Sequence, residues 1–586
     1  MFMDKPPKRL FEFGPFCLDT VERLLLRDGE PVSLTQKAFE TLCVLVENSG
    51  HVLEKDDLIK RIWPDSFVEE ATLAQNIFTL RRILGETADK NHYIETVPRR
   101  GYRFVARVSE WFSPASESAA ARQTAAEHQV RSIAVLPFLS LEPAGDDGHF
   151  GMGMADALIT KLSNIRKIIV RPTSAVLKYR GQDQEPISAG RELRVKYVLD
   201  GKIQRSGDRI RVTTQLLDLD TGSPMWADKF DANFIDIFTL QDTISERLVE
   251  ALMLQISSDE RKLLTKHHTT NSEAYQLYLK GRYQWNRWTE NGFGKSIQCF
   301  QQVIEIDPYY ALAYAGLSDV YNALAFYGYV SPGEAMPQAK EAAELALELD
   351  EMLAEAHLSL ASAQFYYEWD WKAAEQSYRR AIGLNPGYAT AHQGYGLFLV
   401  AMGRFEEATL SLRQAHELDP VSLLINTTMG FPYYFSGEYD KALEQYLKSL
   451  DMNSEFGLTY ASIGDVYVHK GMYAEALSQY RKAISLLGEN PDLLSSLAYA
   501  YAQSGDKAVA IKASNELMKL SQQRYISPLA LAVIELGLGN KESALKWLEE
   551  AYEKRSNRIA FLKVNPVFDS LRYDHRFISL LARIGL

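Results

Sequence analysis

The chain has 586 residues, 46% of them hydrophobic, and a formal net charge of −12. This length is too great for one hydrophobic core, so we expect three or four domains. The negative charge excludes a protein that coats nucleic acid along its whole length, but it does not exclude one local basic face. The three cysteines lie far apart and match no metal-ligand or disulfide spacing, which favours a reducing compartment.

Neither a targeting signal nor a membrane segment is expected. The first nine residues are polar and contain two prolines, unlike the apolar centre of a signal peptide. No run of 18 or more apolar residues occurs along the chain. We therefore expect a cytoplasmic protein without a membrane partner.

Residues 9–108 are predicted to form the first domain. Short strand-like segments at 10–13, 16–19 and 24–27 give way to helical periodicity at 35–47, 55–63 and 70–84. Two β-like segments follow at 93–97 and 102–105. The third helix should bury a stripe of four residues, Leu73, Ile77, Leu80 and Leu84. Strands, three helices and a terminal hairpin predict an α+β winged helix.

Segments 68–82 and 93–104 resemble the most characteristic parts of the OmpR/PhoB-type winged-helix DNA-binding domain. The N-terminal position of this domain is similar to that in CadC- and ToxR-like regulators. The resemblance implies that the third helix enters the major groove of double-stranded DNA and that the hairpin reaches a neighbouring minor groove. Carried over by position, it implies base-facing residues Thr72, Gln75, Asn76 and Thr79. It implies backbone-facing residues Arg82, Thr96, Arg99 and Arg100.

The chemistry of these residues agrees with DNA binding. Amide and hydroxyl side chains suit base edges, and arginines at a helix end and a hairpin suit phosphates. Seven basic and three acidic residues lie between Arg81 and Arg107, so this part of an acidic chain is locally basic. One departure concerns Phe78 and Thr79, which stand where the family often has arginines. The alternative interpretation is a winged helix that contacts protein, within a scaffold that binds no DNA.

Residues 109–130 are predicted to form a linker, because 113–127 is rich in Ala and Ser. Residues 131–265 alternate strand-like and helical segments, which predicts a small α/β layer domain. Within it, 151–162, 171–174 and 199–227 resemble the TolB N-terminal-like domain. That resemblance implies a fold and a role as an adaptor or sensing platform.

Several short motifs imitate catalytic or ligand-binding sites. Gly294-Lys295-Ser296 lacks the first glycine of a phosphate-binding loop, and Gly151-x-Gly153 lacks the third glycine of a dinucleotide loop. We interpret Gly151 as the start of a helix. His267-His268 has no second ligand pair nearby. We therefore expect no catalytic residues, no metal, no cofactor and no enzymatic activity.

A 34-residue period marks residues 271–586. One column is alanine, at Ala374, Ala408, Ala442, Ala476, Ala510 and Ala544. A second is glycine, at Gly403, Gly437, Gly471, Gly505 and Gly539. We expect glycine with positive φ at the turn within each unit and alanine where helices cross most closely. The period resembles that of tetratricopeptide repeats, which predicts an all-α solenoid of roughly eight units.

Such a solenoid is expected to bind a protein partner or a second copy of the chain. The residues predicted to face its groove are Gln393, Leu397, Thr427, Phe431, Tyr434 and Asp465. The alternative is that many of these side chains pack only between helices. Together the segments predict a DNA-binding transcription regulator whose repeat array recruits a partner or allows a homodimer on DNA.

Overall fold

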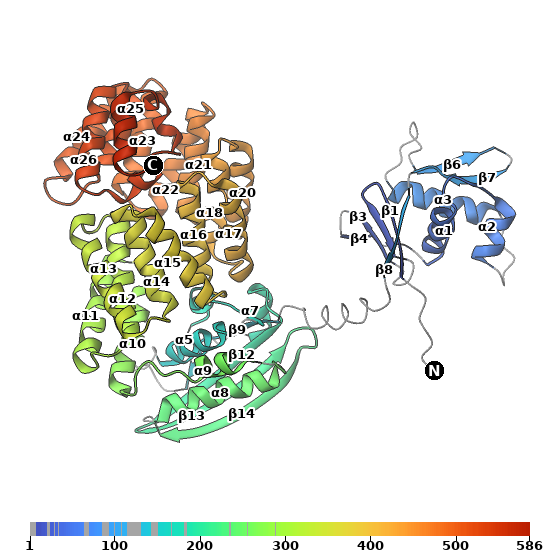
Figure 1. Cartoon of the computed structure of the whole chain (residues 1–586), viewed down its shortest axis with the longest axis horizontal. Helices are drawn as coiled ribbons and strands as arrows, with labels where there is room; N and C mark the ends of the chain where they lie inside the picture. The colour runs from blue at the N-terminus through green and yellow to red at the C-terminus, as the bar shows by residue number, and fades with distance from the viewer. Residues whose placement is uncertain are drawn as a thin grey trace. The chain divides into compact units, whose positions relative to one another are not determined.

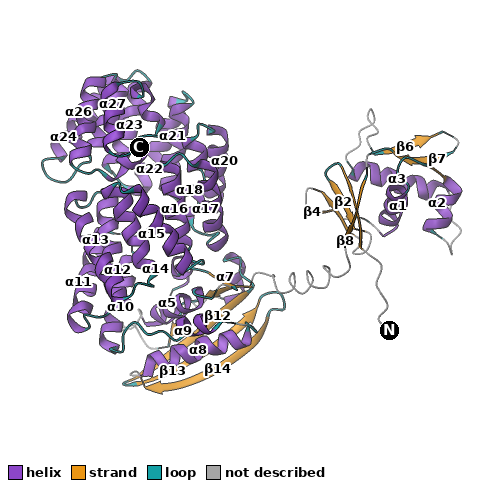
Figure 2. Cartoon of the chain, viewed as in Figure 1, coloured by secondary structure: helices purple, strands orange, loops and turns teal. Residues whose placement is uncertain are grey.

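The computed structural model describes residues 8–19, 24–27, 30–32, 34, 36–63, 70–84, 93–98, 100–106, 108–113, 131–141, 150–165, 167–180, 185–233, 236–254, 256–287 and 289–586. The chain divides into two compact units, Met1–Gln129 and Val130–Leu586. Figure 1 gives the labels of their elements, and Figure 2 separates helices from strands.

The first unit begins with an antiparallel sheet in the order β4-β3-β2-β1-β8. These strands are Glu30–Val32, Leu24–Arg27, Phe16–Asp19, Lys8–Phe13 and Ser109–Ser113. The three strands that we predicted are confirmed. Strand β8 was not anticipated: it lies in the predicted linker and pairs with β1 along its whole length.

Three helices and a second sheet complete this unit. The helices are α1 (Gln36–Glu47), α2 (Lys55–Ile62) and α3 (Glu70–Ile83). The second sheet has the order β5-β7-β6, with strands Val52–Glu54, Gly101–Phe104 and Ile94–Val97. Gly101 is required where β7 passes β5, because a Cβ there would lie 1.8 Å from the carbonyl oxygen of Leu53. The predicted helices and hairpin are confirmed, and β5 is an addition.

Helix α3 packs one face into the core of the winged helix. Its four predicted core residues, Leu73, Ile77, Leu80 and Leu84, are all buried. They share one cluster with Phe13 and Phe104, whose rings meet edge to face at 5.1 Å. Burial of this stripe fixes which side of α3 faces solvent.

The second unit contains a six-stranded mixed sheet in the order β11-β9-β12-β13-β14, with β10 also paired to β12. The strands are Ile168–Val170, Arg131–Val135, Tyr197–Ser206, Arg209–Asp218, Ser223–Asn233 and Leu139–Ser140. Its helices are α5 (Phe150–Ser163), α6 (Thr173–Val176), η2 (Leu177–Tyr179), α7 (Pro186–Glu192), α8 (Ile237–Ala251) and α9 (Ser258–Leu264). The predicted α/β layer is confirmed.

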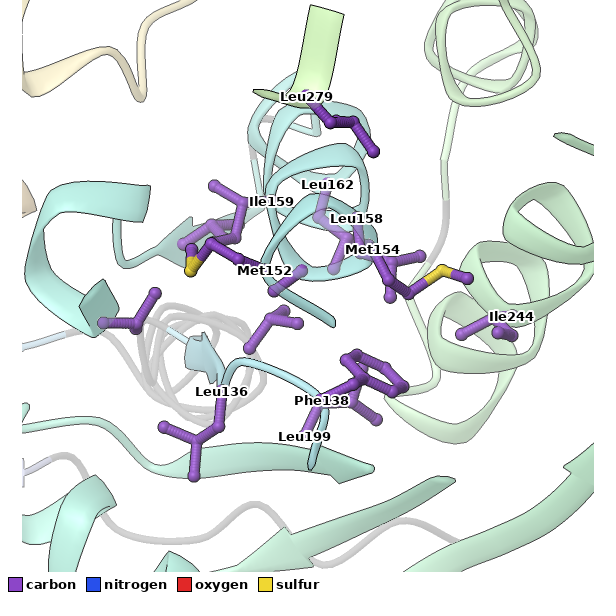
Figure 3. Packing of buried hydrophobic residues seen from close by; sticks show 14 of the residues in the cluster. Leu136, Phe138, Met152, Met154, Leu158, Ile159, Leu162, Leu199, Ile244 and Leu279 are labelled. Atoms are coloured by element: carbon purple, nitrogen blue, oxygen red, sulfur yellow. The ribbon is translucent and has the colours of Figure 1, made fainter. Parts of the chain in front are cut away.

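Helix α5 connects this sheet to the repeat array. A Cβ on Gly151 would lie 1.9 Å from the carbonyl oxygen of Phe138, and one on Gly153 would lie 2.2 Å from Leu279. Figure 3 shows Leu279, on the first array helix, facing the apolar side of α5. The two glycines therefore allow α5 to pack closely against Phe138 on one side and Leu279 on the other. Gly151 lies in the first turn of α5, so the predicted helix start is confirmed. One cluster of buried residues runs from Ile133 to Ala356.

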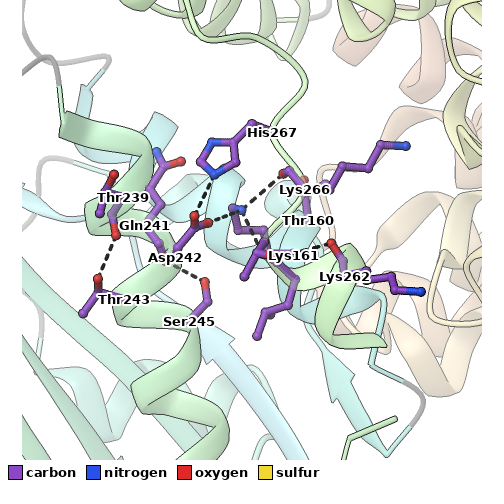
Figure 4. A network of polar contacts seen from close by, with 12 residues as sticks. Thr160, Lys161, Thr239, Gln241, Asp242, Thr243, Ser245, Lys262, Lys266 and His267 are labelled. Atoms are coloured by element: carbon purple, nitrogen blue, oxygen red, sulfur yellow. Dashed lines mark hydrogen bonds and ion pairs between the residues drawn. The ribbon is translucent and has the colours of Figure 1, made fainter. Parts of the chain in front are cut away.

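A polar network lies at the same junction (Figure 4). The buried ammonium of Lys161 donates to Asp242 at 2.7 Å and to the carbonyl of Leu264 at 2.8 Å. The second carboxylate oxygen of Asp242 lies 2.6 Å from Nε2 of His267. These contacts hold the segment after α9 against α5 and α8, so His267 has a structural partner.

The rest of the second unit is a helical solenoid. Its elements are α10 (Ser272–Trp285), α11 (Glu290–Ile306), α12 (Ala311–Phe326), α13 (Pro332–Leu349), α14 (Ala354–Ala363), η4 (Gln364–Glu368), α15 (Trp371–Leu384), α16 (Ala389–Ala401), α17 (Phe405–Leu418), α18 (Leu423–Thr428), α19 (Phe431–Phe435), α20 (Tyr439–Met452), α21 (Gly457–His469), α22 (Tyr473–Leu487), α23 (Pro491–Gln503), α24 (Lys507–Leu520), α25 (Pro528–Leu538), α26 (Lys541–Glu553), η5 (Asn557–Phe561), η6 (Pro566–Leu571) and α27 (His575–Arg583).

Both sequence columns of the solenoid have the predicted structural roles. All six alanines are completely buried, and all five glycines have positive φ, between 72° and 104°. Four residues after an alanine, Tyr446 and Tyr480 are buried against Gly430 and Gly464. A Cβ at either glycine would lie within 3.0 Å of the tyrosine ring. Small residues thus set the spacing between helices, as the periodicity predicted.

Arg171 fastens the sheet layer to the middle of the solenoid. Its side chain is only 4% exposed, and its guanidinium donates to the carbonyls of Leu193, Arg194, Glu417 and Leu418 at 2.6–3.1 Å. The last two carbonyls end helix α17, where a cation is favoured by the helix dipole. Burial lowers the pKa of Arg171 to about 10, which leaves it charged at neutral pH.

Replacing Arg171 by Met should lower the free energy of unfolding by about 3–5 kcal/mol, because it leaves four carbonyls without this donor and buried Asp419 without its neighbouring cation. Urea denaturation followed by circular dichroism measures the change. Arg413→Met, on the exposed side of α17, is the matched control and should change stability little. Equal effects would contradict the assignment of Arg171 as a fastening residue.

Ala442→Trp should overpack the crossing of α20 and cost about 1–3 kcal/mol or more. Lys441→Trp, one residue earlier on the exposed side, should cost less than about 0.5 kcal/mol. Thermal unfolding of the two variants in parallel tests whether the alanine positions require a small side chain. A lower melting temperature for Lys441→Trp than for Ala442→Trp would show that close packing at the alanine is unimportant.

Candidate nucleic-acid interface

The solvent-facing side of α3 carries the residues predicted to contact bases. Thr72 and Gln75 are exposed, whereas Asn76 and Thr79 are half-buried. The Asn76 amide donates to the hydroxyl of Thr41 on α1 at 3.3 Å, and the Thr79 hydroxyl donates to the carbonyl of Gln75 at 2.9 Å. Gln75 and Thr72 thus offer polar groups directly to solvent, and Asn76 is held against α1. Contact of all four with bases remains a prediction.

Arg81 ties the end of α3 to the hairpin, a role that the sequence analysis did not assign. Its guanidinium donates to the carbonyl of Ile94 at 2.9 and 3.2 Å and to the hydroxyl of Thr96 at 2.8 Å. The neighbouring strand adds an ion pair between Arg103 and Glu95 at 2.6 Å. Helix and hairpin are therefore held in fixed relation. Two neighbouring arginines on a helix point in different directions, so the pair Arg81-Arg82 indicated that one of them has a partner within the domain. Arg81 is half-buried, and Arg82 is exposed.

The predicted backbone contacts divide into three groups. Arg82 and Arg100 are exposed, at the end of α3 and in the β6–β7 turn. The hydroxyl of Thr96 is exposed but already accepts from Arg81. Arg99 lies outside the described residues. Contact of these residues with the DNA backbone remains a prediction.

The residues predicted to line a partner groove are less accessible. Gln393, Thr427 and Tyr434 are buried, and Leu397, Phe431 and Asp465 are half-buried. Thr427 shares hydrogen bonds with Ser449 and Thr459 at 3.1 and 2.6 Å, and the Gln393 amide donates to Thr428 at 3.3 Å. These polar side chains satisfy one another between helices. Partner binding by the six residues remains a prediction.

The chain's own C-terminal segment contacts this face of the solenoid. The amide of buried Asn557 donates to the carbonyls of Ala325 and Phe326, which end α12. The ring of Phe561 stacks on Phe435 at 5.6 Å and meets Phe365 edge to face at 5.9 Å. Phe431 belongs to the same apolar cluster. Residues 557–561 therefore cover part of the surface that the sequence analysis assigned to a partner.

Asp465, one of the six predicted groove residues, has its carboxylate in a largely apolar environment. The Tyr480 hydroxyl donates to its carboxylate at 2.6 Å. Burial raises the pKa of Asp465 to about 6, while the hydrogen bond from Tyr480 and the charge of Arg558 oppose this increase. A carboxylate in such surroundings serves the packing of α21 against α22.

Two further properties concern the whole described chain. Among the described residues, no group of three or more His, Cys, Asp or Glu side chains is arranged to hold a metal ion. No described helix combines the length and apolar character needed to cross a membrane.

Family models match four segments of the chain. Residues 29–104 match "Transcriptional regulatory protein, C terminal", and residues 128–247 match "HilA/YgeH-like transcriptional regulator, second domain". Residues 365–422 match "Tetratricopeptide repeat" and 464–505 match "TPR repeat". The OmpR/PhoB-type and repeat predictions are confirmed. For the middle part the matching model is the HilA-like second domain, and the likeness to a TolB N-terminal-like domain stays a prediction.

Three curated relatives are similar over different lengths. Putative adenylate cyclase 3 of Rhizobium meliloti (strain 1021) is 32% identical over 32% of each chain. The transcriptional regulator HilA of Salmonella typhimurium (strain LT2) is 24% identical over 73% of this chain and 74% of its own. The transcriptional activator CadC of Escherichia coli (strain K12) is 35% identical over 15% of this chain and 17% of its own. The alignment thus spans about a third of the first relative. This chain joins a segment that matches the C-terminal part of transcriptional regulatory proteins to segments that match tetratricopeptide repeats.

Proposed function

We propose that this protein is a cytoplasmic transcription regulator that binds a double-stranded operator through α3 and the β6–β7 hairpin. The observation that carries the proposal is the two-sided character of α3, with a buried apolar stripe and an exposed side that includes Gln75 and Arg82. A major groove admits one helix, and amide and guanidinium groups pair with base edges and phosphates. Arg81 supports the helix in one orientation relative to the hairpin.

The scaffold alternative assigns the same helix to protein contact. It gives no reason for exposed arginines at both Arg82 and Arg100, one at the end of α3 and the other in the β6–β7 turn. The match of residues 29–104 to the regulator model also favours DNA. We therefore retain DNA binding as the function that accounts for more of the surface.

The second unit is proposed to supply regulation rather than catalysis. A likeness of its sheet layer to the TolB N-terminal-like domain, inferred from sequence, would suit an adaptor or sensing platform. The solenoid is proposed to bind a protein partner or a second copy of the chain, which would place two winged helices on one operator. Because residues 557–561 cover part of the predicted groove, such contacts would use other surfaces of the array or displace this segment.

Arg100→Ala in the full-length chain should weaken binding to all DNA sequences and reduce the salt dependence by about one counterion. Gln75→Ala should instead relax sequence preference, at about 1–3 kcal/mol. Fluorescence anisotropy with a selected operator and a scrambled duplex, at several salt concentrations, separates the two effects. If the unmutated chain binds no DNA, or binds it with no dependence on salt concentration, the alternative of a protein-binding scaffold is favoured.

Fragment 1–129 should bind a two-site operator at least about 100-fold more weakly than the full-length chain if the second unit brings two winged helices together. The cut follows the boundary between the compact units, because the buried cluster from Ile133 to Ala356 would be broken by a cut near residue 271. A one-site operator is the control and should bind both proteins alike. Equal affinity for the two-site operator would assign the array to recruitment of another protein.

A further inference from the structure

A large aromatic side chain stands among the polar groups of α3. Phe78 is 62% exposed, although the stripe that packs α3 into the core is complete without it. It lies one turn after Gln75 and one turn before Arg82, and Ala74, four residues earlier, is also exposed. The exposed side of α3 therefore contains an apolar strip, Ala74 and Phe78, beside a polar strip, Gln75 and Arg82.

The helical positions place Phe78 near the middle of the DNA-facing side. At about 100° per residue, Gln75 and Arg82 point almost directly away from the buried stripe, and Phe78 lies within roughly 50° of that direction. Asn76 lies roughly 110° away from it, in agreement with its contact to Thr41. A helix that enters the major groove with this orientation brings Phe78 closer to the base edges than Asn76.

We infer that Phe78 is a specificity-determining residue that contacts the 5-methyl group of a thymine in the major groove, beside an adenine contacted by Gln75. This inference rests on the proposed DNA binding. The thymine methyl is the one apolar group that base pairs present in this groove, and Phe is among the side chains that contact it. Glutamine pairs with the two hydrogen-bonding groups of adenine. The two side chains together favour A·T pairs at the centre of the helix contact.

The experiment removes either partner of this contact: the methyl group of the thymine or the ring of Phe78. The full-length chain is used to select an operator from random duplexes, and each thymine of the operator is then replaced singly by deoxyuridine, which pairs identically but lacks the methyl. For the unmutated chain, binding should weaken about fourfold at one or two thymines, the effect of burying one methyl group. Phe78→Ala should bind the original operator more weakly and should show no loss at those deoxyuridines.

The matched control is Tyr573→Ala, which removes a ring that is 97% exposed in the other compact unit. This variant should lose affinity at the same deoxyuridines as the unmutated chain. If Phe78→Ala also loses affinity there, or if no deoxyuridine weakens binding by the unmutated chain, the inference is overturned while DNA binding stands. If selection enriches no sequence at all, the proposed function fails and the inference fails with it. Circular dichroism of Phe78→Ala, expected to match the unmutated chain, excludes unfolding as the cause.

Discussion

The guanidinium of Arg171 joins the sheet layer of the second compact unit to the end of helix α17 in the solenoid. Four carbonyl groups accept its hydrogen bonds, two in the sheet layer and two at the end of α17. A buried charge is costly unless its donors are satisfied, so a shift of the layer relative to the solenoid would leave this guanidinium without part of its acceptors. The apolar contact of α5 with Leu279 and the Lys161–Asp242 pair act at a second junction, where the sheet layer meets the start of the array.

This fastening changes how the solenoid can function. An isolated repeat array presents one concave surface along its length. Here one end of the array is covered by the sheet layer, and residues 557–561 lie against α12, η4 and α19. The remaining surface, rather than the predicted groove as a whole, is available to a partner without rearrangement.

The winged helix is built on a different principle. The orientation of its helix α3 relative to its hairpin depends on Arg81 and on the buried stripe of α3. The boundary between the compact units therefore allows the proposed DNA binding to be tested on fragment 1–129 alone. The exposed side of α3 combines hydrogen-bonding groups with the ring of Phe78, and this combination suits a groove that offers both polar edges and methyl groups.

The sequence by itself determined the buried stripe of α3 and the two small-residue columns of the solenoid, but not the burial of Gln393, Thr427 and Tyr434. The stripe of Leu73 and Leu80 and the columns of Ala442 and Gly437 follow from local periodicity, because helix geometry repeats every few residues and each repeat imposes the same spacing. Only the tertiary structure decided what covers those surfaces. The side chain of Asn557 donates a hydrogen bond to the carbonyl of Ala325, 232 positions away in the sequence, and β8 pairs with β1 as an edge strand. Such pairings depend on the path of the whole chain, which no local pattern encodes.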